Sequence, residues 1–285
     1  MRILMLLLML CTSLNSYGHS EQRIIALAPH IVENLYAIGA GEHIVATVEH
    51  ADYPQAAQDI PRIGGYYGIQ IEKVLALQPT LVVVWQSGNK AKDIEALKRL
   101  GVPLLVSQVE GPLDIAKEIR AIGELTGHAI EAEQVAAQFE QRYQRLKEQY
   151  QSASQQRKKV FYQLWPKPMM TVNNNTLIGK AIELCGGDNV FADSRADYPQ
   201  ISVENVLLSA PDVIVMADEK GADNSAINWQ QWTTIPAVKH NHINSINADL
   251  LHRYSLRLLD GIEQLCMVVN NSEQQAHSRQ GDAVH

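Results

Sequence analysis

The chain has 285 residues and a formal net charge of −7; apolar residues make up 46% of it and charged residues 19%. These values are ordinary for a globular protein with room for one large domain or two small ones. Acidic and basic residues are scattered without forming a basic face, which disfavours nucleic acid as a partner.

The first 18 residues have the form of a secretory signal peptide. Arg2 precedes an apolar run over residues 3–11, and a small residue at Gly18 suits cleavage between Gly18 and His19. The run is too short to span a bilayer, although an uncleaved membrane anchor is the alternative. No later segment is apolar enough to cross a membrane, so we expect an exported protein that is not membrane-inserted.

Strands and helices alternate through the first half of the remaining chain. Continuous apolar runs predict strands at 23–28, 43–48, 80–85 and 102–107, and helical spacing of apolar residues predicts helices at 32–38, 72–77, 92–100 and 113–125. A glycine-rich loop is expected at 63–68. Strands that are apolar throughout, rather than alternately apolar and polar, indicate a parallel sheet covered by helices on both faces.

One long helix is expected from Ala129 to Gln156, because this segment lacks Gly and Pro and consists almost only of strong helix formers. Its apolar side chains recur at three- and four-residue steps and form one stripe: Ala132, Val135, Phe139, Tyr143, Leu146 and Tyr150. Two dozen such residues make a rod of roughly 36 Å. A stiff helix of that length between two α/β lobes leaves a cleft between them, where we expect the function.

After this helix the pattern restarts, with strands expected at 159–164, 213–217 and 242–246 and helices at 176–184, 203–208 and 256–269. The predicted fold is therefore α/β, with two lobes that each contain a mainly parallel sheet flanked by helices. The lobes are expected to extend over 19–127 and 157–270 and to be joined by a rigid helix at 128–156. The polar tail at 271–285 is expected to be disordered.

An internal match relates the two halves. Residues 71–84 and 203–216 align without a gap, and Glu72 recurs as Glu204. Chance similarity between two βα units is the alternative, because leucine, valine and proline are common in such units. Packing does not require the glutamate, and this favours a genuine repeat.

Removal of the leader leaves two cysteines, Cys185 and Cys266. Two cysteines in an exported chain predict one disulfide bond, with two separate buried thiols as the alternative. Closing a loop of about 80 residues contributes roughly 4 kcal/mol to stability in the chain-entropy model.

Candidate binding residues follow the predicted strands, because ligands of open parallel sheets lie beyond the carboxyl ends of the strands. The residues at these positions and on neighbouring loops include Pro29, His50, Tyr66, Tyr67, Trp85, Trp165, Tyr198 and the run 247–253. Aromatic faces with a few polar anchors suit a large, flat, partly apolar ligand, whereas core packing is the alternative for any single ring. Asp249 and Arg253, four residues apart, are either a surface pair or a polar pair at the floor of the cleft.

Motifs for catalysis are missing from the sequence. It has no nucleophile elbow, HExxH motif or phosphate loop. The ten histidines are dispersed, and the close pair His240 and His242 lacks further zinc ligands nearby. We therefore expect a binding protein rather than an enzyme, with neither a metal site nor a resident cofactor.

Several short motifs carry a resemblance to a known family. They are 51–54 (ADYP) and 68–75 (GIQIEKVL) in the first lobe, and 183–191 (ELCGGDNVF), 193–195 (DSR) and 198–200 (YPQ) in the second. With these motifs, the chain from Arg23 to about Val269 resembles the periplasmic binding proteins with a rigid interdomain helix that serve importers of metal chelates. Within that family it is most similar to the cobalamin (vitamin B12) branch, whose second cysteine matches Cys266.

The resemblance implies roles for individual residues. It implies corrin contacts from Pro29, His50, Tyr66, Trp165, Tyr198, Asp249 and Arg253, to which Trp85 and Tyr67 are added from their positions at strand ends. Glu72 and Glu204 match surface glutamates that, in the family, bind arginines of the two permease subunits. The family has an aromatic residue at the position of His50 and tryptophan at those of Tyr66 and Tyr198, so a different corrinoid, a lower affinity or an approach of His50 to the cobalt are alternatives.

The resemblance thus implies a monomeric periplasmic protein that captures cobalamin as a transported ligand and delivers it to the permease of an ABC importer. Haem or a ferric siderophore on the same fold is the nearest alternative. Haem would require Tyr66, Tyr67 or His50 as an iron ligand, and an anionic siderophore would require several arginines, of which only Arg253 is well placed. A tetrapyrrole metal chelatase would require paired histidine and acidic residues across the cleft, which the sequence does not provide.

Overall fold

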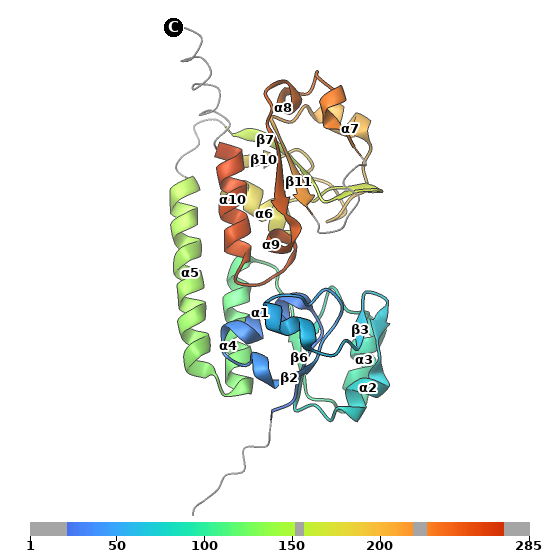
Figure 1. Cartoon of the computed structure of the whole chain (residues 1–285). Coiled ribbons are helices and arrows are strands. Elements are labelled where there is room, and N and C mark those ends of the chain that lie inside the picture. The colour runs from blue at the N-terminus through green and yellow to red at the C-terminus, as the bar shows by residue number, and fades with distance from the viewer. Residues whose placement is uncertain (1–21, 152–156, 219–226, 271–285) are drawn as a thin grey trace, which may run out of the picture.

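The computed structural model describes residues 22–151, 157–218 and 227–270. Over these residues the chain forms two α/β lobes, and one long helix, α5 (Ala129–Gln151), lies alongside both of them (Figure 1). Each lobe contains a four-stranded parallel sheet flanked by helices, which confirms the predicted fold class. The expected signal peptide, the tail at 271–285 and the last five residues of the expected central helix lie outside the described residues.

The N-terminal lobe is built on the sheet β2-β1-β5-β6, in which all neighbours are parallel. Its main elements are β1 (Ile24–Ala26), α1 (Pro29–Ala37), β2 (Ile44–Ala46), α2 (Ile71–Ala76), β5 (Leu81–Trp85), α3 (Ala91–Arg99), β6 (Leu104–Ser107) and α4 (Pro112–Thr126). On β5, Val83 packs with side chains of α1 and α4, whereas Val82 and Val84 pack with those of α2 and α3. Both faces of the sheet are therefore buried, which accounts for the continuous apolar runs.

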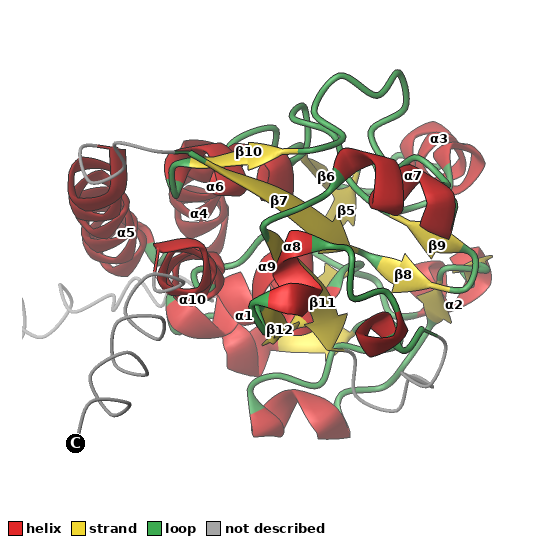
Figure 2. Ribbon diagram, turned by 90° about the horizontal axis from the view of Figure 1, so that it is seen from above, coloured by secondary structure: helices red, strands yellow, loops and turns green. Residues whose placement is uncertain are grey.

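The C-terminal lobe is built on the parallel sheet β10-β7-β11-β12. Its main elements are β7 (Lys158–Gln163), α6 (Leu177–Leu184), β10 (Gly187–Asn189), α7 (Val203–Ser209), β11 (Val213–Asp218), α8 (Pro236–Lys239), β12 (Ile243–Asn247), α9 (Ala248–His252) and α10 (Leu258–Asn270). Val160 and Tyr162 on β7 pack with α6 and α10, whereas Phe161 between them packs with α7 and α8 on the other face (Figure 2). This sheet is also covered on both sides.

The two sheets share one topology, because the strands of each lobe are arranged in the order second, first, third, fourth. In both lobes a short helix leads through a proline into the third strand. The residues before these prolines, Gln78 and Ala210, have matching left-handed backbones, with φ of 46° and 45°. The same unusual conformation at the same aligned position supports a genuine repeat rather than chance similarity.

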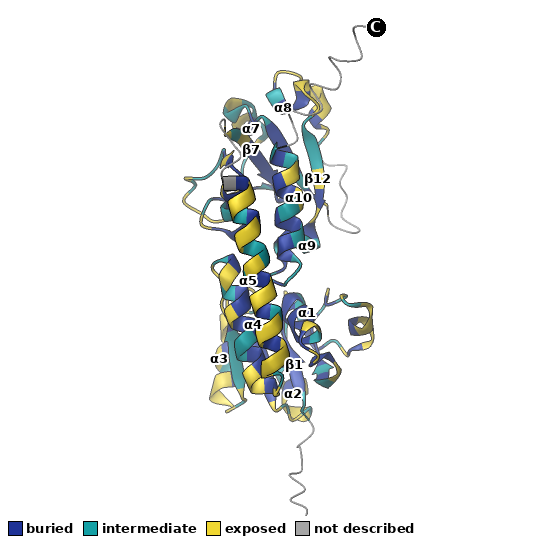
Figure 3. Cartoon of the chain, turned by 90° about the vertical axis from the view of Figure 1, so that its left-hand side faces the viewer, coloured by how far each residue is buried: buried dark blue, intermediate teal, exposed yellow. Residues whose placement is uncertain are grey.

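Helix α5 packs against α4 of the N-terminal lobe and α10 of the C-terminal lobe. Its buried residues are Ala132, Ala136, Phe139, Leu146 and Tyr150, and its outer face is exposed (Figure 3). The packing on α4 is close, since a Cβ added to Gly123 would lie 2.2 Å from the Cβ of Ala132.

Two arginines attach α5 to the lobes at its polar edge. Arg120 of α4 contacts Glu133 and Glu140 of α5, and Arg142 of α5 contacts Asp260 and Glu263 of α10, with N–O distances of 2.6–2.7 Å. Exposed pairs of this kind add little stability, so the buried stripe of α5 is what holds it in place.

Some short elements differ from the sequence-based expectation. Helix α1 begins at Pro29, three residues early, because proline suits the first turn of a helix. The structure adds the hairpins β3–β4 (Gly64–Gly65, Gly68–Ile69) and β8–β9 (Trp165–Pro166, Met169–Met170), the 3-10 turns Gly41–His43, Gln55–Asp59 and Trp229–Gln231, and strand β10. The expected glycine-rich loop is thus the β3–β4 hairpin.

The predicted disulfide is confirmed. Cys185, directly after α6, is bonded to Cys266 on α10, and the two residues are 81 positions apart. The bond joins two helices on the same face of the C-terminal sheet, and both cysteines are fully buried.

The left-handed conformation of Ala210 predicts a stabilising substitution. A residue with a side chain pays roughly 1–2 kcal/mol there, whereas glycine avoids this strain and loses about 0.5–1 kcal/mol of the gain through its greater entropy when unfolded. We therefore expect Ala210→Gly to raise the free energy of unfolding by about 0.5–1 kcal/mol in urea titrations. Ala96→Gly, inside α3, is the matched control and should lower it by about 1 kcal/mol. Equal destabilisation by both variants would contradict the assignment.

Candidate functional site

A cavity of about 800 Å³ lies between the lobes. The N-terminal lobe contributes Trp85, the last residue of β5, Gln86 and Ser87, which directly follow it, and the loop after β6. The C-terminal lobe contributes Leu164 and Trp165 after β7, the start of α6, Tyr198 and the chain after β12. The cavity is therefore at the carboxyl ends of both parallel sheets, where such folds bind ligands, and its volume suits a small-molecule site.

Three of the predicted aromatic residues line this cavity: Trp85, Trp165 and Tyr198. The indole of Trp85 is held by close packing, because a Cβ added to Gly88 would lie 1.8 Å from its ring. Its buried Nε1 has no hydrogen-bond partner. Trp165 and Tyr198 are exposed, with 42% and 44% of their surface accessible. Trp165 and Tyr198 are therefore cavity walls rather than core residues, whereas Trp85 both lines the cavity and packs against the apolar core.

Tyr254 is a cavity residue that lies just beyond the candidate run 247–253. Its ring meets that of Trp85 edge-on, with centroids 5.7 Å apart, so that the two lobes touch through these rings. Burial, together with the neighbouring Tyr198 and Asp197, raises the pKa of its phenol. Tyr254 follows directly on Arg253, but no strand-end or motif pattern distinguished it.

His252, which belongs to the candidate run 247–253, also lines the cavity. Its Nε2 lies 3.0 Å from the hydroxyl of Tyr162 on β7. Burial lowers the pKa of His252 to about 4, so the imidazole is neutral near pH 7. It offers the cavity a polar but uncharged group.

The other predicted aromatic residues lie outside the cavity lining. Tyr66 and Tyr67 form the turn of the β3–β4 hairpin, and Tyr66 is 85% exposed at its tip. Tyr67 is held against the lobe, because its hydroxyl donates to Glu49 (3.0 Å) and its carbonyl accepts from Lys90 (2.5 Å). Of the two, Tyr66 has the freer ring.

Pro29 and His50 both belong to the N-terminal lobe. Pro29 is half-buried at the first turn of α1. His50 is exposed, with a left-handed backbone (φ 63°), in the loop after β2. Neither lines the cavity.

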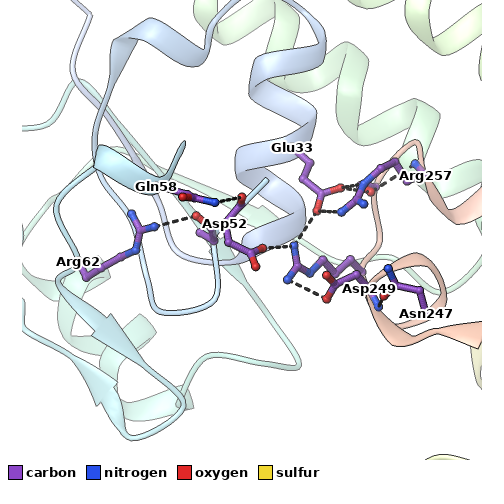
Figure 4. Close-up of polar contacts among 10 residues, drawn as sticks. Glu33, Asp52, Gln58, Arg62, Asn247, Asp249 and Arg257 are labelled. Atoms are coloured by element: carbon purple, nitrogen blue, oxygen red, sulfur yellow. Dashed lines mark hydrogen bonds and ion pairs between the residues drawn. The ribbon is translucent and has the colours of Figure 1, made fainter. Parts of the chain in front are cut away.

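Asp249 and Arg253 form the expected pair, with Nη2 and Oδ1 2.8 Å apart. The pair does not stand alone, because Arg253 Nη1 also lies 3.0 Å from Glu33 Oε1 and 2.8 Å from Asp52 Oδ1 of the other lobe (Figure 4). The guanidinium is therefore buried in an ionic contact between the lobes. No pattern in the sequence indicated Glu33 or Asp52 as partners of Arg253.

The charges around the cavity are few and mainly negative. Glu110 and Asp197 line it together with one lysine, Lys180, whose Nζ donates to the carbonyl of Glu110 (2.5 Å) across the lobe boundary. The described residues contain no group of three or more His, Cys, Asp or Glu side chains placed to hold a metal ion. Such a lining suits an uncharged or cationic ligand better than a polyanion.

Glu72 and Glu204 are far from the cavity. They lie exposed in the first turns of α2 and α7, and Figure 1 shows these helices on the side of the molecule opposite α5. Hydrogen bonds from Ser202 and from its own backbone lower the pKa of Glu204. Each lobe thus carries one of these two glutamates, and both lie on the same side of the molecule.

Comparison with known proteins places the chain in a family. The model of the periplasmic binding protein family matches residues 24–250. The chain belongs to this family. Among the helices in the described ranges, none combines the length and apolar composition that a membrane span requires.

The relatives agree with the predicted resemblance. The vitamin B12-binding protein of Vibrio parahaemolyticus is 36% identical over 256 residues, which is 90% of this chain and 92% of that protein. The vitamin B12-binding protein of Yersinia pestis is 33% identical over 87% of this chain and 86% of that one. The solved structure of the periplasmic vitamin B12-binding protein BtuF of Vibrio cholerae is 36% identical, with a TM-score of 0.82 over 88% of this chain and 98% of that chain.

A periplasmic haem-binding protein shares the fold. The periplasmic haem-binding protein RhuT of Roseiflexus has a TM-score of 0.78 over 88% of this chain and 99% of that chain, at 22% identity. This likeness concerns the fold alone.

The histidine behind the cavity predicts how stability depends on pH in this binding protein. His30 of α1 packs against Trp85 and Tyr254, and burial, with the charge of Arg253, lowers its pKa to about 3. The unfolded chain binds a proton at this histidine below pH 6.5, and the folded chain does not until about pH 3. Stability should therefore fall as the pH drops from 6.5 towards 3, by about 1.4 kcal/mol per pH unit from this residue.

His30→Gln should flatten that slope by the same amount in urea titrations between pH 4 and 6.5, whatever its effect on stability at pH 7. The exposed His240→Gln is the matched control and should leave the slope unchanged. If the slopes of the wild type and His30→Gln are identical, His30 does not resist protonation.

Proposed function

We propose that this protein captures cobalamin (vitamin B12) in the cavity between its lobes and delivers it to an ABC importer in the inner membrane. The observation that carries the proposal is the 36% identity to vitamin B12-binding proteins over nine-tenths of the chain. This identity and the aromatic-lined cavity between the lobes both favour a binding role. We propose no catalysis.

The walls of the cavity suit the macrocycle. The rings of Trp85, Trp165, Tyr198 and Tyr254 all line the cavity and offer apolar faces to a broad, flat corrin. Gln86, Gln108 and Asn175 lie among these rings and can exchange hydrogen bonds with the amide side chains of a corrinoid.

Residues at the rim complete the proposed contact set. Pro29, His50, Tyr66, Tyr67, Asp249 and Arg253 lie outside the cavity lining and would contact the parts of cobalamin that project from it. Tyr66, at the tip of its hairpin, is best placed to reach over the ligand. Cobalamin is here a transported ligand and not a cofactor.

The charge of the cavity favours a corrinoid over haem. Haem carries two carboxylates, and these would meet Glu110 and Asp197 with Lys180 as the one lysine or arginine of the lining. This distribution of charge acts against haem.

We propose that the protein works in the periplasm as a monomer, after removal of residues 1–18. The two lobes at 19–127 and 157–270, with the helix at 128–156 between them, would then grip the ligand with small movements only, because α5 is packed on both. Glu72 and Glu204 would bind the two permease subunits. Charge pairs at an interface edge mainly set orientation and association rate.

Ligand identity can be tested by calorimetry with cyanocobalamin, cobinamide and haemin in parallel. We expect binding of cyanocobalamin with one site per chain, and a fall in affinity of about tenfold or more in Trp165→Ala, because an aromatic contact contributes about 1 kcal/mol beyond its burial. Leu100→Ala, an exposed apolar side chain outside the cavity, is the control and should bind normally. Tight binding of haemin with none of cyanocobalamin would refute the proposal.

The docking role is testable in vesicles that contain the cognate importer. The double variant Glu72→Ala/Glu204→Ala should retain its affinity for cyanocobalamin but lose most of the transport, because both carboxylates lie far from the cavity. Glu95→Ala/Glu124→Ala, two exposed helix glutamates of the same charge, should transport at the wild-type rate. Unimpaired transport by the first variant would show that docking uses other residues.

A further inference from the structure

Glu33 is a buried carboxylate at the junction of the two lobes. Only 3% of its side chain is exposed. Its Oε1 accepts from Arg253 Nη1 (3.0 Å) and Arg257 Nη2 (2.6 Å), and its Oε2 accepts from Arg257 Nε (2.9 Å) and Ser255 Oγ (2.5 Å). Glu33 belongs to α1 of the N-terminal lobe, and all of these donors belong to the C-terminal lobe (Figure 4).

The contact extends along one face of α1. His30 and Asn34, one helical turn from each other, flank Glu33 and are buried with it. The Nδ2 of Asn34 donates to the carbonyl of Tyr254 (3.3 Å), and the ring of His30 packs on that of Tyr254. One polar helix face therefore meets one chain segment, 253–257, from the other end of the sequence.

Stability alone does not explain such a cluster. A buried ion pair costs so much desolvation that an apolar contact of the same size is often at least as stable. Its geometry, in contrast, is strict: Arg257 grips both oxygens of Glu33 as a fork, which fixes direction as well as distance. The arrangement therefore defines the distance and the orientation of one lobe relative to the other.

The same cluster holds the Asp249–Arg253 pair. Arg253 shares its guanidinium between the buried Glu33 and two more exposed carboxylates, Asp52 (42% exposed side chain) and Asp249 (26%). Glu33 is the member that solvent does not reach. The position of Arg253, and through it that of Asp249, therefore depends on Glu33.

We propose that Glu33 is a positioning residue: through Arg253 and Arg257 it fixes the resting width of the cleft and orients the Asp249–Arg253 pair without touching the ligand. The part that concerns the ligand rests on the proposed function. The part that concerns the lobes does not, and it can be measured on protein without ligand.

The decisive measurement is the distance between spin labels on the two lobes in ligand-free protein. Labels attached through Lys92→Cys on α3 and Lys239→Cys on α8 are exposed and lie outside the cluster and the cavity. We expect one narrow distance distribution in the parent protein and a broader or shifted one in Glu33→Gln, which keeps the shape of the side chain and removes its charge. Glu124→Gln, an exposed glutamate of α4, is the matched control and should leave the distribution narrow.

Cyanocobalamin affinity provides the second readout. If the cleft of Glu33→Gln has the width that binds ligand only about one-tenth of the time, the affinity of this variant for cyanocobalamin falls about tenfold, and one site per chain is retained. In Glu33→Gln/Arg257→Gln the unpaired buried charge is removed together with its partner, so thermal stability should recover relative to Glu33→Gln while the broad distribution remains. This double variant also serves if Glu33→Gln does not fold.

The outcomes separate the two proposals. An unchanged distance distribution in the Glu33 variants overturns the positioning role, even if their stability falls. A broadened distribution with unchanged cyanocobalamin affinity overturns its link to the ligand. Failure of the parent protein to bind any corrinoid refutes the proposed function and leaves the interlobe result standing.

Discussion

One continuous apolar core joins the lobes, and the cavity depends on it. This core extends from the inner face of the first sheet at Val83, through α4, α5 and α10, to the inner face of the second sheet at Tyr162. Because protein interiors are close-packed and deform little, two sheets that share a core cannot open freely. Helix α5 packs along the outside of this core and stiffens it. The cavity is the space left between the carboxyl ends of the two sheets.

Buried polar contacts complement the apolar core on the side of the cleft. The core resists separation but is not directional, whereas the cluster around Glu33 is directional and places individual side chains. The rings of Trp85 and Tyr254 stand between the two systems: they pack against the core and also line the cavity. A substitution in the apolar core or in the cluster around Glu33 would therefore alter the surface that lines the cavity.

The secondary structure was predictable from the sequence where a side-chain pattern determines it. The apolar runs of β5 and β11 and the uninterrupted helix formers of α5 follow from burial and propensity. The β3–β4 hairpin and β10 were not predictable in this way, because they consist largely of glycine and polar residues. Gly64 faces the backbone of Gly68 and Ile69 so closely that a Cβ would lie 2.7 Å from the nearest carbonyl oxygen. That requirement is set by backbone pairing and leaves no periodic signal.

The site was predictable in part for the same reason. Trp85 is the last residue of the apolar strand β5, and Trp165 lies two residues beyond the end of β7. The carboxyl ends of parallel strands converge on one edge of the sheet. The roles of Tyr254, Glu33 and Asp52 depend on contacts between segments about 200 residues apart, such as that of Arg253 with Asp52. A single sequence contains no record of such contacts. The i,i+4 spacing of Asp249 and Arg253 identified the pair but not that the other lobe completes it.

The internal repeat relates the positions of Glu72 and Glu204 but not those of the cavity rings. Glu72 and Glu204 occupy equivalent helices, which suits attachment to a transporter made of two similar subunits. The cavity rings come from positions that are not equivalent: Trp85 ends the third strand of its lobe, whereas Trp165 follows the first strand of the other. A ligand whose two faces differ needs two different walls. The repeat is therefore retained where a symmetric partner would bind, and it is broken where an asymmetric ligand would.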